Sequence, residues 1–138
     1  MVAEVDVNRD TGVILVRRLV IAHDCGPISN PNGVENQLQG GALAGISRSL
    51  LEQVTWDDQK ITSVDWKSYR AISLGIELPK IETVLINRTE GKVMGVGETA
   101  LIVVGASISN AVFDATGIKL REIPFTPEKV KAAFAART

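Results

Sequence analysis

The chain has 138 residues, of which 45% are hydrophobic and 22% charged, values typical of one globular domain. Its 15 basic and 16 acidic residues give a net charge of −1, which excludes the strong field of a nucleic-acid or membrane-surface binder. The single cysteine, Cys25, permits no internal disulfide, and the longest apolar run, near residues 100–106, is too short to span a bilayer. The expected location is the cytoplasm, or the periplasm if the chain is exported with a partner.

Two strands are predicted at the start of the chain. Residues 2–7 alternate between apolar and polar side chains, which indicates a half-buried strand, and the cluster 8–12 is typical of a turn. Residues 13–22 are almost continuously apolar except at Arg17 and Arg18. We therefore predict a β-hairpin whose second strand is buried on both faces for most of its length.

Three residue types that can bind metals, His23, Asp24 and Cys25, follow one another where this strand ends. Adjacent strand residues point to opposite faces, and His23 is the only histidine, so the spacing does not support a metal site. We assign no residue to a metal. Instead we expect Asp24 and Gly26 to shape a turn and Cys25 to be a small buried hydrophobe.

The segment 30–33 is a helix-start signal. Asn32 is the predicted N-cap, and Glu35 would complete a capping box. Apolar residues then recur at every fourth position from Val34 to Leu50, which predicts an amphipathic helix to about residue 53.

Glycine is unusually frequent inside this predicted helix, at Gly40, Gly41 and Gly45. Each glycine costs about 1 kcal/mol relative to alanine in a helix interior. A helix that tolerates three glycines is expected to pack closely against another backbone or a bound group. Gln37, one turn earlier, would present an amide at that surface.

The second half of the chain alternates extended and helical patterns. We predict a second hairpin over 54–64, an irregular surface loop over 65–78 and a strand over 81–87. A helix is predicted over 100–116, with Gly117 as its C-terminal cap. A last helix is predicted from Thr126–Pro127 to about residue 136. The expected fold class is α+β: β-hairpins and a strand packed with a long glycine-containing helix and two C-terminal helices.

The stretch from Gly95 to Ala100 places two glycines directly before a lone carboxylate, Glu98, at the entry to an apolar segment. Glycine permits close approaches that a side chain would block. A carboxylate that is desolvated at such a place becomes a stronger base. The alternative is an ordinary acidic residue at a helix N-terminus, where the helix dipole favours it.

An ordered series of motifs resembles a known family. The series is Asp24-Cys25-Gly26, Asn30-Pro31, Gln37-x-x-Gly40-Gly41, Gly95-Val96-Gly97-Glu98, Asn110-Ala111, Ala115-Thr116-Gly117, Arg121 and Pro124. It resembles the C-terminal end of the large, molybdenum-binding subunit of the xanthine dehydrogenase/aldehyde oxidase family, and most of all the branch with the isoquinoline 1-oxidoreductase β-subunit and bacterial aldehyde dehydrogenases. The resemblance covers nearly the whole chain.

The resemblance implies a function. The family oxidises an aldehyde or N-heterocycle with water as the oxygen source, using molybdopterin cytosine dinucleotide or molybdopterin, and passes electrons to iron–sulfur clusters in a partner subunit. By the same resemblance Glu98 is the general base that takes a proton from the hydroxyl nucleophile. The residues matched to the cofactor-binding segments are Gln37, Gly40, Gly41, Gly95, Val96 and Gly97.

The chain also departs from the family pattern. Thr99 stands where many relatives have proline, and the family's other glycine-rich segments, substrate-positioning residues and iron–sulfur cysteines are absent. We therefore expect residues 1–138 to be a C-terminal fragment of a molybdopterin-binding domain, inactive without the rest of the large subunit. The alternatives are a non-catalytic fragment or assembly subunit that folds or pairs with a partner, and a small-molecule binding module built on the glycine-rich helix.

Overall fold

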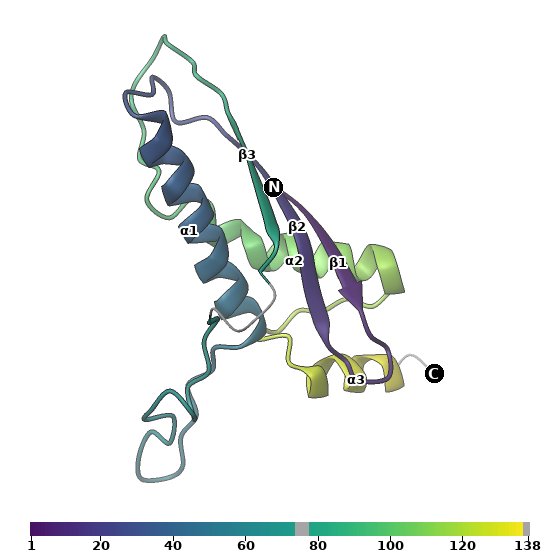
Figure 1. Cartoon of the computed structure of the whole chain (residues 1–138). Helices are drawn as coiled ribbons and strands as arrows, with labels where there is room; N and C mark the ends of the chain where they lie inside the picture. The colour runs from purple at the N-terminus through teal and green to yellow at the C-terminus, as the bar shows by residue number, and fades with distance from the viewer. Residues whose placement is uncertain (74–77, 137–138) are drawn as a thin grey trace.

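The computed structural model describes residues 1–73 and 78–136, and over these residues it has an α+β architecture, as predicted. The elements are β1 (Val2–Val7), β2 (Ile14–His23), α1 (Pro31–Leu50), β3 (Lys80–Leu85), α2 (Leu101–Thr116) and α3 (Pro127–Ala135). Figure 1 shows the strands side by side, with α1 along one side of the sheet, α2 behind it and α3 beyond the β1–β2 turn. No helix within the described residues is long and apolar enough to cross a membrane.

The predicted first hairpin is confirmed, since β1 and β2 pair antiparallel. The Asn8 side chain accepts hydrogen bonds from the backbone N–H groups of Asp10 and Thr11 and so organises the turn. The register shifts between Glu4 and Val5, because Glu4 pairs with Arg18 whereas Val5 pairs with Val16. The extra residue in β2 is a β-bulge, which explains how two consecutive arginines can both be exposed within an otherwise alternating strand.

The strand predicted over 81–87 is β3, and it pairs in parallel with β2, in the sheet order β1-β2-β3. A parallel pair needs a long crossover connection. Here α1 and the loop that follows it supply that crossover. The predicted loop over 65–78 is irregular where it is described, and residues 74–77 lie outside the described residues.

The prediction that β2 is buried on both faces is wrong for its outer face. Arg18 donates hydrogen bonds to the Glu82 carboxylate at 2.8 and 3.0 Å, and Lys80 lies 2.8 Å from the same carboxylate. These bonds, first from Arg18 and then from Lys80, lower the pKa of Glu82 to about 2. The outer face of the sheet therefore carries exposed ion pairs that involve β2 and β3.

Helix α1 begins two residues earlier than predicted. Pro31 occupies the first turn, where its fixed φ and missing N–H are tolerated. The cap is therefore Asn30, whose Oδ1 accepts from the Gly33 N–H at 3.0 Å, rather than Asn32. The predicted capping box with Glu35 is wrong for the same reason, and the helix ends at Leu50 rather than near residue 53.

The core lies between the inner face of the sheet and the three helices. The residues predicted on the inner face of α1 are buried or packed against this core, as is Val130 of α3. The largest fully buried apolar side chains of the core are Leu19, Leu38, Val104, Ile108, Val112 and Val130. The predicted caps of α2 and α3 are confirmed: Gly117 is left-handed, with φ of 73°, and the Thr126 hydroxyl accepts from the Lys129 N–H.

The second predicted hairpin, over 54–64, is confirmed only as a turn. One isolated antiparallel bridge joins Trp56 and Ile61, and no strand is assigned on either side of it. Local sequence signals identify the turn. A ladder of hydrogen bonds, however, is stable only beside neighbouring strands, and residues 54–64 have none within the described residues.

Candidate active site

The two segments predicted to line a cofactor site meet in the structure. Gln37, in the second turn of α1, donates a hydrogen bond from Nε2 to the Gly97 carbonyl oxygen at 2.6 Å. One helical turn further, a Cβ at Gly41 would lie 3.5 Å from the Ala100 Cβ, an ordinary contact. Helix α1 and the loop that ends at Glu98 are thus neighbours, although about 60 residues separate Gln37 from Gly97 in the sequence.

A second contact holds this loop at the end of β2. The Met94 N–H donates to the Cys25 carbonyl at 2.9 Å. Gly26 has a φ of 75°, and a Cβ there would collide with the Lys92 carbonyl oxygen. Sequence reasoning expected only a turn at Gly26. The residue also allows a close approach of the loop 91–98, because the backbone at Lys92 lies where a Cβ would stand. The glycine itself was the sequence signal available for this role.

Glu98 lies directly before α2 and its side chain is exposed. The helix begins after Ala100 with no side-chain cap, so Glu98 does not act as an N-cap carboxylate. Among the described residues, no hydrogen bond or ion pair reaches the Glu98 carboxylate. The chain therefore presents this carboxylate to its surroundings, and desolvation of it requires atoms from outside the chain.

The glycines near Glu98 divide into two groups. A Cβ at Gly45 would lie 2.6 Å from Cγ2 of Val104, so this glycine serves the packing of α1 against α2. A Cβ at Gly40, Gly95 or Gly97 would meet nothing within 4 Å. The last two also lie outside the positive-φ region. Neither space nor conformation within the chain requires glycine at Gly95 and Gly97.

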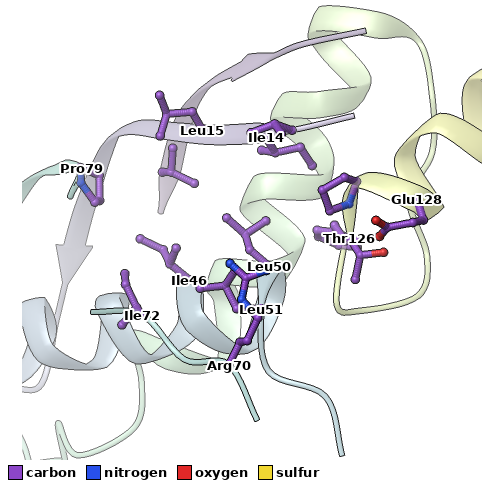
Figure 2. A pocket seen from close by; sticks show the side chains of 14 residues that line it. Ile14, Leu15, Ile46, Leu50, Leu51, Arg70, Ile72, Pro79, Thr126 and Glu128 are labelled. Atoms are coloured by element: carbon purple, nitrogen blue, oxygen red, sulfur yellow. The ribbon is translucent and has the colours of Figure 1, made fainter. Parts of the chain in front are cut away.

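A pocket of about 450 Å³ lies elsewhere, between the end of α1, β2 and the start of α3. Figure 2 shows Ile14, Ile46, Leu50 and Ile72 around it, with Arg70 and Glu128 as charged members of its lining. Gln37, Glu98 and the predicted glycines are not among its lining residues. This pocket is therefore separate from the predicted site residues, which are exposed at Gly95, Gly97 and Glu98.

Residues 1–73 and 78–136 contain no group of three or more His, Cys, Asp or Glu side chains that could hold a metal ion. Cys25 is buried, as predicted.

Comparisons with known proteins match the chain to one family. Residues 1–75, more than half of the chain, match the model of the molybdopterin cofactor-binding domain. The chain belongs to the molybdopterin-binding subunits of the xanthine dehydrogenase/aldehyde oxidoreductase family. The match confirms the resemblance drawn from the motifs.

Individual relatives agree with this assignment. The chain is 43% identical over 96% of its length to a nicotinate dehydrogenase polypeptide of Pseudomonas putida, and it covers 11% of that protein. It is 31% identical over 92% of its length to the isoquinoline 1-oxidoreductase β-subunit of Brevundimonas diminuta, and it covers 16% of that protein. The aldehyde oxidoreductase of Desulfovibrio desulfuricans superposes with a TM-score of 0.82 at 32% identity, over 95% of this chain and 15% of that one. The chain thus spans less than a fifth of each of these proteins.

Proposed function

We propose that this chain is the C-terminal, Glu98-bearing part of a molybdenum hydroxylase that oxidises an aldehyde or N-heterocycle with water as the oxygen source. The observation that carries the proposal is the Gln37–Gly97 hydrogen bond, because it brings both predicted cofactor segments to one surface beside an unpaired carboxylate. The names of the relatives support both substrate classes: a nicotinate dehydrogenase and an isoquinoline oxidoreductase support an N-heterocycle, and an aldehyde oxidoreductase supports an aldehyde.

The open surface fits a large cofactor. Gly40, Gly95 and Gly97 leave room where side chains would otherwise stand, and Gln37 fixes the loop between them. We infer that these residues, with Gly41 and Val96, form one wall of the site for molybdopterin or molybdopterin cytosine dinucleotide, and that the rest of the large subunit closes it. The bound group supplies the two-electron oxidation chemistry, and a partner subunit with iron–sulfur clusters takes the electrons.

Within this site Glu98 acts as the general base. The backbone bond from Met94 to Cys25 and the bond from Gln37 to Gly97 hold the loop, so the carboxylate has a defined position from which it accepts a proton from the oxygen nucleophile. The rest of the large subunit closes the site and excludes water from the surroundings of Glu98. The chain's own contribution is thus to position and orient the proton acceptor.

Replacing Glu98 tests this role in the chain assembled with the rest of the large subunit. Because a positioned base contributes about 10²- to 10⁴-fold to a rate, Glu98→Gln should lower kcat by that factor while molybdenum and pterin contents stay unchanged. Glu90→Gln, at an exposed carboxylate directly before this loop, is the matched control and should keep the kcat of the parent. Near-normal turnover of Glu98→Gln would contradict the proposal and favour the non-catalytic alternative.

A further inference from the structure

The segment that follows α1 carries exposed apolar side chains that no other described part of the chain covers. We name residues 54–66 the tryptophan arm. It contains both tryptophans of the chain, Trp56 with 73% and Trp66 with 81% of its surface exposed. Val54, Ile61 and Val64 are also exposed on the arm. Figure 1 shows this segment extending away from the sheet and the helices.

The arm has a defined shape despite its exposure. The Asp57 N–H donates to the Lys60 carbonyl at 2.9 Å, and the Thr62 N–H donates to the Thr55 carbonyl at 2.8 Å. The Thr55 and Thr62 hydroxyls also lie 2.8 Å apart. The arm is therefore held by hydrogen bonds of its own backbone and side chains. Its exposed indole rings do not pack into a hydrophobic core.

The base of the arm is fixed to the body of the molecule. The Tyr69 hydroxyl donates to the Glu52 carboxylate at 2.8 Å, and the Ile72 N–H donates to the buried Ser47 hydroxyl at 2.9 Å. The backbone that carries the two tryptophans is therefore ordered before binding, so little backbone freedom is lost on docking.

We propose that the tryptophan arm docks onto the remainder of the large subunit, with Trp56 and Trp66 seated in an apolar cleft of that remainder. The proposal rests on the proposed function, because it takes the remainder to be the partner. The matched relatives are at least five times longer than this chain, so protein outside it is available to cover the arm.

The size of the arm favours this occupant over a second copy of the chain. A stable interface between separate proteins uses about 20–30 residues on each side, and the arm offers fewer than that. A small anchor suffices where the two parts belong to one polypeptide or already share another interface, because the effective concentration is high. The small number of exposed apolar side chains on the arm is therefore sufficient for docking within the large subunit.

Hydroxyl-radical footprinting with mass spectrometry tests the proposal residue by residue. Trp56 and Trp66 should oxidise rapidly in the isolated chain and about tenfold more slowly once the chain is assembled with the remainder of the large subunit. Unchanged oxidation of both tryptophans in the assembled protein would overturn the proposal. Protection that rises with concentration in the isolated chain would also overturn it, since the occupant would then be a second copy.

A double substitution, Trp56→Ser with Trp66→Ser, provides the second arm of the test. Both side chains are exposed, so the variant should keep the circular dichroism of the parent, and its affinity for the remainder should fall about tenfold or more. Phe113→Ser, at an exposed aromatic on α2, is the control and should bind like the parent. If the double variant assembles normally while Glu98→Gln still abolishes turnover, the docking proposal fails and the proposed function stands.

Discussion

At the scale of single residues, two glycines with nearly the same positive φ lie in different parts of the molecule. Gly26 has a φ of 75° and lies against the Lys92 carbonyl, whereas Gly12 has a φ of 77° and lies against the Pro127 carbonyl. A Cβ would collide with the backbone at either place. The first collision displaces the loop that ends at Glu98, and the second displaces the start of α3.

Alanine substitutions at these two glycines distinguish an effect on stability from an effect on catalysis. Gly26→Ala and Gly12→Ala should each destabilise the chain by about 1–3 kcal/mol, which denaturant unfolding measures. In the assembled enzyme only Gly26→Ala should also lower kcat per bound cofactor, because only that substitution moves Glu98, the proposed base. Equal kcat values for the two variants would show that the close backbone approach at Gly26 does not position Glu98.

At the scale of elements, the glycines of α1 show what sequence could and could not determine. The sequence predicted that Gly40, Gly41 and Gly45 signal a close approach, and left open whether to a backbone or to a bound group. The structure assigns Gly45 to contact with Val104 of α2 and leaves Gly40 in open space. Helical periodicity identifies the inner face of a helix, but which neighbour lies against it depends on tertiary packing.

Two substitutions in this one helix should have opposite effects on the isolated chain. Gly45→Ala adds a methyl group 2.6 Å from Val104 and should cost about 1–3 kcal/mol through overpacking. Gly40→Ala meets nothing within 4 Å and should stabilise the chain by about 0.5–1 kcal/mol, because alanine restricts the unfolded state. Urea unfolding of both variants checks the signs, and destabilisation by Gly40→Ala would contradict the open space at that position.

Element boundaries were most predictable where the signal is local. Thr126–Pro127 and Gly117 mark helix ends through bonds within a few residues, and both were predicted correctly. The parallel pairing of β3 with β2 was not predicted, because it joins Arg18 to Lys80 across α1 and the tryptophan arm. The register of distant strands depends on the whole sheet rather than on either strand.

At the scale of the whole molecule, the chain forms a core of its own but an incomplete site. Leu19, Leu38 and Ile108 are fully buried, so the fold does not depend on outside atoms at its centre. Glu98 and the glycines before it are exposed. The family motifs identified these residues from sequence, but their exposure could not be predicted, since it reflects which parts of the larger protein this chain contains.

The double substitution Gly95→Ala with Gly97→Ala tests whether these exposed glycines serve the cofactor site rather than the fold of the chain. Neither glycine has a positive φ and neither position is crowded, so the free energy of unfolding of the isolated chain should change by less than about 0.5 kcal/mol. In the assembled enzyme the added methyl groups should intrude on the cofactor, and a clash of about 1.4 kcal/mol weakens its binding tenfold. Molybdenum and pterin content per assembled enzyme measures this, with Glu90→Ala, directly before the loop, as the control. Full cofactor content in the double variant would show that the surface opened by Gly95 and Gly97 does not face the cofactor.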